Sequence, residues 1–299
     1  MKLLTDQNID QAVALLQAAE LVAFPTETVY GLGAGLFLPE AISKIFVAKG
    51  RPADNPLIAH ISHVEQLDLI VKEISQEAQL LIERFFPGPL TLILPKTERV
   101  PACAAAGLST IGIRMPSHPL AHRLIAAVGM PLVAPSANLS GRPSATKAEH
   151  VIHDFKDSIA AVLEGECGIG LESTVLCLDP EPRVLRPGAI TAEQIGEVLG
   201  REVKLHTQKS HAPQSPGMKY RHYAPLAHVQ LCFSRDELEQ TCAQCTGRFY
   251  SFYPETHTLY ANLREADLRG MTHVFIFCDA KVQANEALMN RLMRAAQLL

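Results

Sequence analysis

The chain lacks the features that mark several common classes of protein. It contains no tryptophan, and no apolar run approaches the roughly 20 residues of a membrane-spanning helix. The N-terminus turns polar by Thr5 and Asp6, so we expect no secretory signal and no membrane association. The net charge is -4, which argues against a broad basic surface for nucleic acid but is compatible with a local basic cavity.

Cysteine shows neither a disulfide pattern nor a clear metal pattern. The chain has 7 cysteines, an odd number, and most stand in apolar runs, as Cys177 does. A single CxxC, Cys242 to Cys245, would make a zinc site together with Cys232 and Cys278, but a second close pair is missing. We therefore predict reduced structural thiols in a cytoplasmic protein, and no metal bound by protein ligands.

Two common phosphate-binding patterns are also missing. The chain has no Walker A sequence, and the spacing of Gly31, Gly33 and Gly35 does not match the dinucleotide fingerprint GxGxxG. Phosphates bound here must therefore be held by cationic side chains, hydroxyl groups and backbone amides.

What the chain does contain is enough apolar sequence for a full core. It is 47% hydrophobic and 19% charged, which excludes intrinsic disorder. Over residues 1–205, helical patterns are interspersed with short apolar strands, and several strands follow one another near the end of this range. This order predicts an α/β fold with a twisted mixed sheet flanked by helices, and not a strict β-α-β alternation.

A polar, proline-rich stretch separates this region from a second one. Residues 206–226 read as a linker, although MKYRHYAP at 218–225 is rich in aromatic and cationic residues for a plain spacer. Strand patterns follow at 228–233, 248–252 and 273–277, with helical patterns at 237–245 and 282–299. The sequence thus predicts a first domain at 1–205, a linker at 206–226 and a smaller α/β domain at 227–299.

Five segments share a pattern in which regular structure gives way to small, hydroxyl or cationic residues. They are 24–33 (FPTETVYGLG), 48–57 (AKGRPADNPL), 109–116 (STIGIRMP), 134–144 (APSANLSGRPS), and 172–175 (ESTV) with 184–188 (VLRPG). Loops at the ends of strands, gathered at one rim, are a common way to build a ligand site. In the second segment Lys49 and Arg51 stand one residue apart, and two converging cations favour a polyphosphate or carboxylate ligand.

Taken together, these segments resemble the threonylcarbamoyladenylate synthase family, with its YrdC-like catalytic domain. The motifs PTETVYGLG, AKGRPxxNPL, GxRxP, APSANxSG and STV occur in the family's order between Ile9 and Leu199. The linker sequence SPGMKYRHYAP resembles the two-domain form, whose accessory domain is Rossmann-like. The resemblance therefore implies a Rossmann-like fold for the second domain of this chain. This C-terminal unit is shorter than is usual in the two-domain form.

The resemblance also implies a reaction. The family makes L-threonylcarbamoyladenylate from L-threonine, bicarbonate and ATP with release of pyrophosphate, for the threonylcarbamoyladenosine modification of tRNA. The implied partners are ATP, L-threonine, bicarbonate and a tRNA threonylcarbamoyl transferase complex that receives the product, and the implied cofactor is Mg2+ with ATP. Such chemistry is accelerated mainly by positioning and by neutralising phosphate charge, and it needs no covalent enzyme nucleophile.

Site residues follow from the same motifs. Lys49 and Arg51 are expected to act in catalysis by facing the ATP phosphates. The implied nucleotide contacts are Lys49, Arg51, Asn55, Thr110, Ser136, Ser144 and Arg186, with His222 and Tyr223 from the linker. The implied threonine contacts are Thr28, His60, Arg114, Ala134 through its backbone, and Ser173. Arg114 can pair bidentately with the threonine carboxylate, and His222 and Tyr223 would exclude water from a labile carbamate.

Alternatives remain at two levels. For single residues, His60 is also compatible with a core histidine, Tyr30 with a packing role, and Glu27 and Glu172 with orienting cations or Mg2+. For the whole chain, the alternative is a double-stranded RNA-binding or ribosome maturation factor, and direct RNA binding is left open. A carbamoyl-transfer enzyme of hydrogenase maturation uses a related domain, but those chains are much longer and carry further parts.

Overall fold

The structure, a computed structural model, describes residues 1–206 and 222–298. The strands of the first domain are β1 (Lys2–Leu4), β2 (Val22–Phe24), β3 (Gly31–Gly35), β4 (Ile58–His60), β5 (Leu90–Pro95), β6 (Thr110–Arg114), β7 (Leu132–Val133), β8 (Ala161–Leu163), β9 (Thr174–Cys177), β10 (Arg183–Arg186) and β11 (Lys204–Leu205). Its α-helices are α1 (Ile9–Gln17), α2 (Pro39–Lys49), α3 (Leu67–Ile70), α4 (Gln76–Phe85), α5 (Pro119–Val128), α6 (Ala148–Phe155) and α7 (Ala192–Leu199).

These strands form one mixed sheet. Their order is β1-β8-β2-β3-β7-β4-β6-β5-β9-β10-β11. Parallel pairs, such as β4 with β6, stand beside antiparallel pairs, such as β4 with β7. The arrangement confirms the mixed sheet flanked by helices that the order of patterns predicts.

Helices cover both faces of this sheet because its strand residues alternate between two apolar clusters. In β2, Val22 and Phe24 pack in a cluster with α1 and α5, whereas Ala23 belongs to the larger cluster that includes α2, α4 and α6. β8 behaves in the same way, with Val162 in the larger cluster and its two neighbours in the smaller one. Successive strand residues point to opposite faces, so a continuous apolar strand requires cover on both sides.

The second domain is a three-stranded parallel sheet with helices. Its strands β12 (His228–Cys232), β14 (His273–Phe277) and β13 (Phe249–Phe252) lie side by side in that order. Helix α8 (Arg235–Gln244) joins β12 to β13, α9 (Leu259–Leu268) joins β13 to β14, and α10 (Ala280–Gln283) and α11 (Glu286–Ala295) follow. Parallel strands need such helical crossovers, and the structure confirms the predicted smaller α/β domain.

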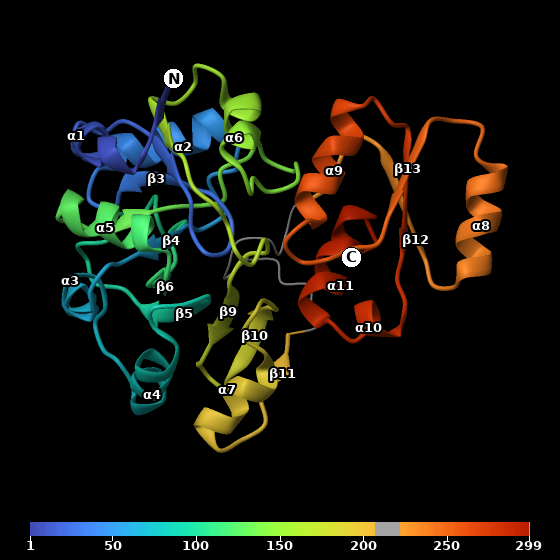
Figure 1. The fold of residues 1–299 in the computed structure, drawn as a ribbon. Coiled ribbons are helices and arrows are strands. Elements are labelled where there is room, and N and C mark those ends of the chain that lie inside the picture. Colours follow the sequence, from blue (N-terminus) through green and yellow to red (C-terminus); the bar gives the residue numbers. More distant parts are fainter. Residues whose placement is uncertain (207–221, 299) are drawn as a thin grey trace.

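The two domains lie side by side (Figure 1), and they share an apolar cluster. Val29 and Leu171 of the first domain pack in the same cluster as Leu259, Tyr260 and Leu292 of the second. Because apolar side chains from both domains are removed from water there, the contact favours one fixed arrangement of the domains.

Several elements differ from the sequence-based expectation. The patterns do not predict β3, which overlaps the motif segment 24–33, nor α9. They also do not predict β1 and β11, which are edge strands of two or three residues. The helix expected over 282–299 is two helices, because Asn285 begins α11 by accepting a hydrogen bond from the amide of Leu288 at 3.0 Å. Most of the predicted linker, residues 207–221, lies outside the described residues.

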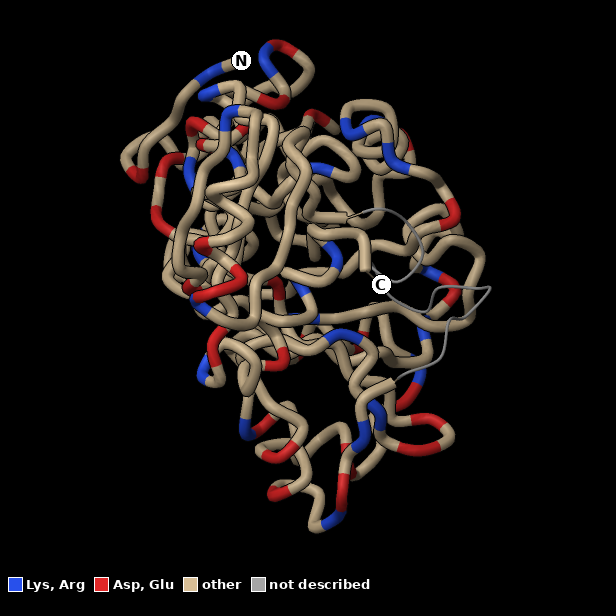
Figure 2. Tube along the Cα trace, turned by 90° about the vertical axis from the view of Figure 1, so that its right-hand side faces the viewer, with Lys and Arg blue, Asp and Glu red and all other residues tan. Residues whose placement is uncertain are grey.

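Two global properties of the described chain bear on function. Lysine and arginine are interspersed with aspartate and glutamate along the traced chain, as Figure 2 shows. Within residues 1–206 and 222–298, no helix combines the length and the apolar character that crossing a membrane requires.

Candidate active site

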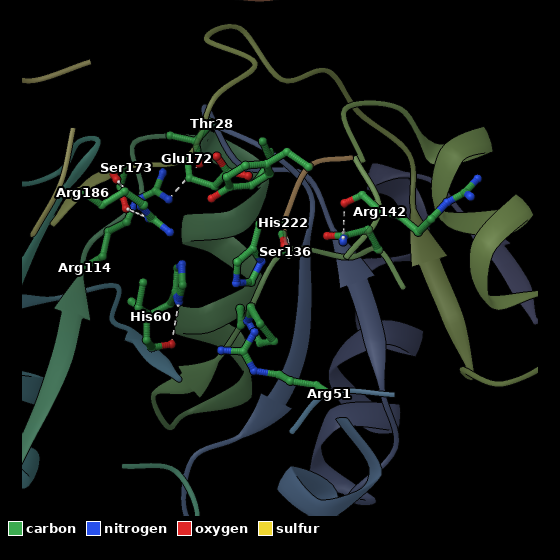
Figure 3. Close-up of a pocket in the computed structure, with 16 residues that line it drawn as sticks. Thr28, Arg51, His60, Arg114, Ser136, Arg142, Glu172, Ser173, Arg186 and His222 are labelled. Carbon is green, nitrogen blue, oxygen red and sulfur yellow. Dashed lines mark hydrogen bonds between the residues drawn. The ribbon is translucent and has the colours of Figure 1, made fainter. Parts of the chain in front are cut away.

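A pocket lies where the motif loops of the first domain meet His222 and Tyr223 of the predicted linker (Figure 3). Most of the predicted site residues line it, namely Thr28, Arg51, His60, Arg114, Ala134, Ser136, Ser173, Arg186, His222 and Tyr223. Residues that are far apart in the sequence therefore come together as the motif pattern predicts. The space left between these side chains has a volume of about 60 Å3.

Neighbouring strands in the middle of the sheet supply one wall of the pocket. His60, the last residue of β4, is in register with Arg114, the last residue of β6. Ile58 and His60 both line the pocket, and residues two apart in a strand project from the same face. The pocket therefore rests on a sheet face as well as on the strand-end loops that the sequence indicates.

Arg114 is held by two residues that follow β2. Its Nη2 is 2.7 Å from Glu27 Oε1, and its Nη1 donates to Thr28 Oγ1 at 2.8 Å. The Arg114 and Glu27 side chains are only 5% and 12% exposed. Burial raises the pKa of the Glu27 carboxyl, but the charge of Arg114 outweighs it and the net effect is a lowered pKa. The pair is thus ionised and fixes a cation at the pocket.

Arg186 fixes Ser173 in a comparable way. Its Nε donates to the Ser173 carbonyl at 3.1 Å, and its Nη2 donates to Ser173 Oγ at 3.1 Å. Ser173 Oγ also lies 2.8 Å from Thr91 Oγ1. Gly188 permits this close approach, because a Cβ atom there would lie 2.3 Å from the amide nitrogen of Thr174.

The two basic residues of the Lys-x-Arg segment, Lys49 and Arg51, lie in different environments. Helix α2 ends at Gly50, whose φ of 58° is in the left-handed region that glycine tolerates. Lys49 is buried, and its Nζ donates to the carbonyl oxygens of Ser136 and Asn138 beneath the pocket wall. Arg51 lines the pocket, and its Nη2 donates to the Pro56 carbonyl at 3.0 Å.

Four predicted residues do not line the pocket: Lys49, Asn55, Thr110 and Ser144. Thr110 begins β6 and Arg114 ends it, so the two are separated by roughly 13 Å at the usual rise per strand residue. Ser144 is buried and its hydroxyl donates to Glu172 Oε1. Direct contact of these residues with a nucleotide stays a prediction.

The structure also brings residues to the pocket that the sequence analysis did not assign. They are Val29, Ile58, Pro135, Asn138 and Arg142. Glu172, for which the sequence leaves a cation-orienting role open, lines the pocket as well. Arg142 and Asn138 belong to the motif 134–144, so the motif itself was the signal that could have indicated them. Ile58 carried no such signal, since only the register of β4 beside β6 shows which strand residues face the pocket.

Histidines in the pocket are neutral. Burial, with the nearby charge of Arg114, lowers the pKa of His60 to about 3, and burial with the charge of Arg51 lowers the pKa of His222 to about 3. His60 Nδ1 lies 3.1 Å from the Ile58 carbonyl. Because a carbonyl only accepts, Nδ1 carries the proton, and Nε2 of His60 is then a hydrogen-bond acceptor.

Stability is expected to fall as the pH drops below 6.5, and His60 provides a direct test. The unfolded chain takes up a proton at this histidine near pH 6.5, whereas the folded chain takes it up only near pH 3. Between these limits His60 alone lowers the free energy of unfolding by up to about 1.4 kcal/mol per pH unit. Urea unfolding at pH 7, 6 and 5 measures the slope, and His60→Asn is expected to make it shallower. An equal slope in the variant would exclude this role.

The described residues do not form a dedicated metal site. No three side chains of the His, Cys, Asp and Glu types gather in a metal-binding arrangement within 1–206 and 222–298. Glu27 pairs with Arg114, and Glu172 pairs with Arg291 at 2.9 Å. Both carboxylates nearest the pocket are therefore engaged with arginines, which matches the cation-orienting alternative that the sequence leaves open for them.

Known proteins match the chain across both domains. A family model that groups Sua5, YciO and YrdC, described as "Telomere recombination", matches residues 14–188. A second, described as "Threonylcarbamoyl-AMP synthase, C-terminal domain", matches residues 190–251. The threonylcarbamoyl-AMP synthase of Bacillus subtilis is 52% identical over 247 residues, covering 80% of this chain and 70% of that protein. That of Pyrococcus abyssi is 48% identical over 245 residues, covering 80% and 72%.

Solved structures agree with these matches. The crystal structure of P. abyssi Sua5 complexed with L-threonine superposes with a TM-score of 0.93 at 38% identity, covering 99% of this chain and 98% of that one. E. coli YciO shares the fold of the first domain, with a TM-score of 0.59 at 24% identity, covering 65% of this chain and 98% of that one. Full-length HypF shares the fold with a TM-score of 0.54 at 21% identity, but only 28% of that chain is covered.

The fold is that of an α/β protein, and the relatives of high identity show that the chain is an enzyme of nucleotidyl transfer. The chain belongs to the threonylcarbamoyl-AMP synthase family, in the form that carries both the catalytic and the C-terminal domain. Members of this family use ATP to form an adenylate that serves tRNA modification.

Proposed function

We propose that this chain joins L-threonine, bicarbonate and ATP into L-threonylcarbamoyl-AMP and pyrophosphate, with the pocket of Figure 3 as its active site. The observation that carries the proposal is the convergence of Arg114, Thr28, Ser173 and Arg186 in one pocket. Two fixed guanidinium groups beside two hydroxyls suit an amino acid that has a carboxylate, an amine and a hydroxyl of its own.

The threonine subsite is assigned to the side of the pocket that holds Arg114. Its guanidinium would pair with the threonine carboxylate, since planar donors match carboxylate geometry. Thr28 and Ser173 would contact the hydroxyl or amine, and Nε2 of the neutral His60 would accept a hydrogen bond. The backbone of Ala134 would complete this subsite.

The phosphate subsite is assigned to the part of the pocket that Arg51 and Ser136 line, with Lys49 supporting the loop through the Ser136 carbonyl. Arg186 donates to Ser173, so it would contact the nucleotide where the two subsites meet. Asn55, Thr110 and Ser144 stay in the nucleotide assignment, although they do not line the pocket. His222 and Tyr223 would cover the bound nucleotide.

The reaction needs positioning more than enzyme nucleophiles. Bicarbonate loses hydroxide to give CO2, and the threonine amine attacks the carbon of CO2. The proton that the amine loses combines with that hydroxide as water, which leaves the carbamate. A carbamate oxygen then attacks the α-phosphorus of ATP, and pyrophosphate leaves with the electron pair of the bond that breaks. The cations would compensate the charge that develops on the leaving pyrophosphate. Because both the carbamate and the mixed anhydride react with water, a dry pocket protects them.

Binding requires the pocket to enlarge. Its space of about 60 Å3 is far below the roughly 300–1,000 Å3 of typical small-molecule sites. Arg51 and His222 both border this space, and we propose that they shift when substrates bind.

We propose the domain limits 1–205, 206–226 and 227–299, with the middle segment carrying His222 and Tyr223.

Mg2+ would enter with ATP as part of the substrate. Glu27 and Glu172 are paired with arginines, so phosphate oxygens and water would supply most of its ligands. In the cell, the product would pass to a tRNA threonylcarbamoyl transferase complex in the cytoplasm.

The test is pyrophosphate release from Mg-ATP and bicarbonate, with and without L-threonine, with mass spectrometry of the adenylate. We expect release that depends on L-threonine and on bicarbonate. Valine, which has the shape of threonine without the hydroxyl, and serine, which lacks the methyl group, are the matched controls and are expected to give much less. Threonine-independent release, or none, would reject the proposal. RNA binding or carbamoyl-phosphate turnover in the same preparation would then favour the alternatives.

A further inference from the structure

One buried arginine of the second domain contacts the catalytic site. Arg291, on α11, is 0% exposed, and its Nε donates to Glu172 Oε2 at 2.9 Å. Its Nη2 donates to the Glu172 carbonyl at 3.3 Å, and its Nη1 donates to the Pro187 carbonyl at 2.8 Å. Arg291 therefore connects α11 to the two segments that carry Ser173 and Arg186.

A tyrosine of the same domain holds the same carboxylate. The hydroxyl of Tyr260, on α9, donates to Glu172 Oε2 at 2.8 Å, while Ser144 donates to Oε1. Glu172 is 6% exposed and lines the pocket next to Ser173. A buried carboxylate needs such donors, because an unpaired buried charge is strongly unfavourable. The position of Glu172 thus depends on both domains.

Tyr223 is held by the same two residues. Its ring stacks on that of Tyr260, with centroids 5.5 Å apart, and the Arg291 guanidinium lies 5.4 Å from its centroid. Tyr223 is 5% exposed and has a φ of 64°, so its backbone lies in the left-handed region and requires support. His222 directly precedes it and lies near the middle of the labelled pocket residues in Figure 3.

We propose that Arg291 and Tyr260 are positioning residues for the catalytic site: by holding Glu172 and Tyr223, they fix the places of Ser173 and His222. The inference deepens the proposed function and rests on it. It gives the short second domain a part in the reaction. Apolar packing alone would not require this network, because a shared apolar cluster joins two domains without a buried ion pair.

Three variants separate the contacts. Arg291→Met keeps the length of the side chain and removes its charge and donors. Tyr260→Phe keeps the stacking on Tyr223 and removes only the hydroxyl. Arg269→Met is the matched control in the same domain, since Arg269 forms an exposed i,i+4 pair with Glu265, with side chains 55% and 40% exposed.

Steady-state kinetics per folded molecule provide the first measurement. We expect Arg291→Met to lower kcat/KM for L-threonine between about tenfold and about a hundredfold, because small displacements of site residues have large effects on rate. Tyr260→Phe is expected to give a smaller loss, and Arg269→Met to stay within about twofold. Adding Glu172→Gln to Arg291→Met removes the unpaired charge and is expected to restore part of the loss. A lower melting temperature with unchanged kcat and KM would overturn the proposal.

Hydrogen–deuterium exchange provides a second measurement that does not depend on the reaction. In Arg291→Met we expect faster exchange in the segments 172–176 and 222–226, with no such change in Arg269→Met. Unchanged exchange in both segments would reject the positioning role even if the wild type shows no threonine-dependent turnover. Faster exchange in an enzyme without that turnover would instead reject the proposed function and leave the positioning role standing.

Discussion

Arg114→Ala is expected to lower kcat/KM for L-threonine by about a hundredfold or more, the largest loss of any single substitution in the pocket. Arg114 is the cation in register with His60 on the sheet, and charge-assisted bidentate pairs of this kind contribute about 2–5 kcal/mol when one partner is truncated. The KM for ATP is expected to change much less. Initial rates of pyrophosphate release over a range of threonine concentrations measure both constants.

Two controls separate substrate recognition from support of the fold. Arg114→Ala also leaves Glu27 buried without its partner, whose Oε1 lies 2.7 Å from Arg114 Nη2. The double variant Arg114→Gln with Glu27→Gln removes both charges, and we expect it to melt closer to the wild type but to bind threonine no better. Arg114→Lys keeps the charge without the fork geometry and is expected to be intermediate. Recovery of threonine KM in the double variant would contradict the carboxylate assignment.

Arg51→Ala is expected to lower kcat by about a hundredfold and to lower the melting temperature less than Lys49→Ala does. Arg51 lines the pocket, and its loss would remove a donor that compensates charge on the phosphates. Removing a single hydrogen-bond donor to a transition state typically lowers kcat by about a hundredfold to a thousandfold. Rates at saturating ATP and threonine, together with thermal unfolding, measure the two quantities.

Lys49→Ala provides the contrast, because this lysine is buried and donates to the Ser136 and Asn138 carbonyls. Removing it would leave the buried Asn138 carbonyl without this donor, which costs about 1–3 kcal/mol of stability. The Ser136 carbonyl would still accept from the Asn138 amide at 3.0 Å. We expect a lower melting temperature as well as lower activity. A Lys49→Ala protein as stable as the wild type would favour a direct phosphate contact over support of the loop.

The sequence determined a large part of the fold and of the site. Five motif segments with glycine, proline, hydroxyl and cationic residues indicated which loops would gather, and ten of the predicted residues do line one pocket. Local signals also mark helix limits: α5 begins with Pro119 and ends before Gly129. Such features act over a few residues, so they can be recognised without knowledge of the rest of the chain.

Tertiary structure alone decided the remaining assignments. Lys49 and Arg51 are neighbours with the same charge, yet one is buried under a loop and the other lines the pocket, because the chain turns at Gly50. Nothing near Arg291 or Tyr260 in the sequence indicates that Glu172, more than 80 residues away, is their partner. The cost of a buried charge depends on which groups surround it after folding, and long-range packing alone supplies that information.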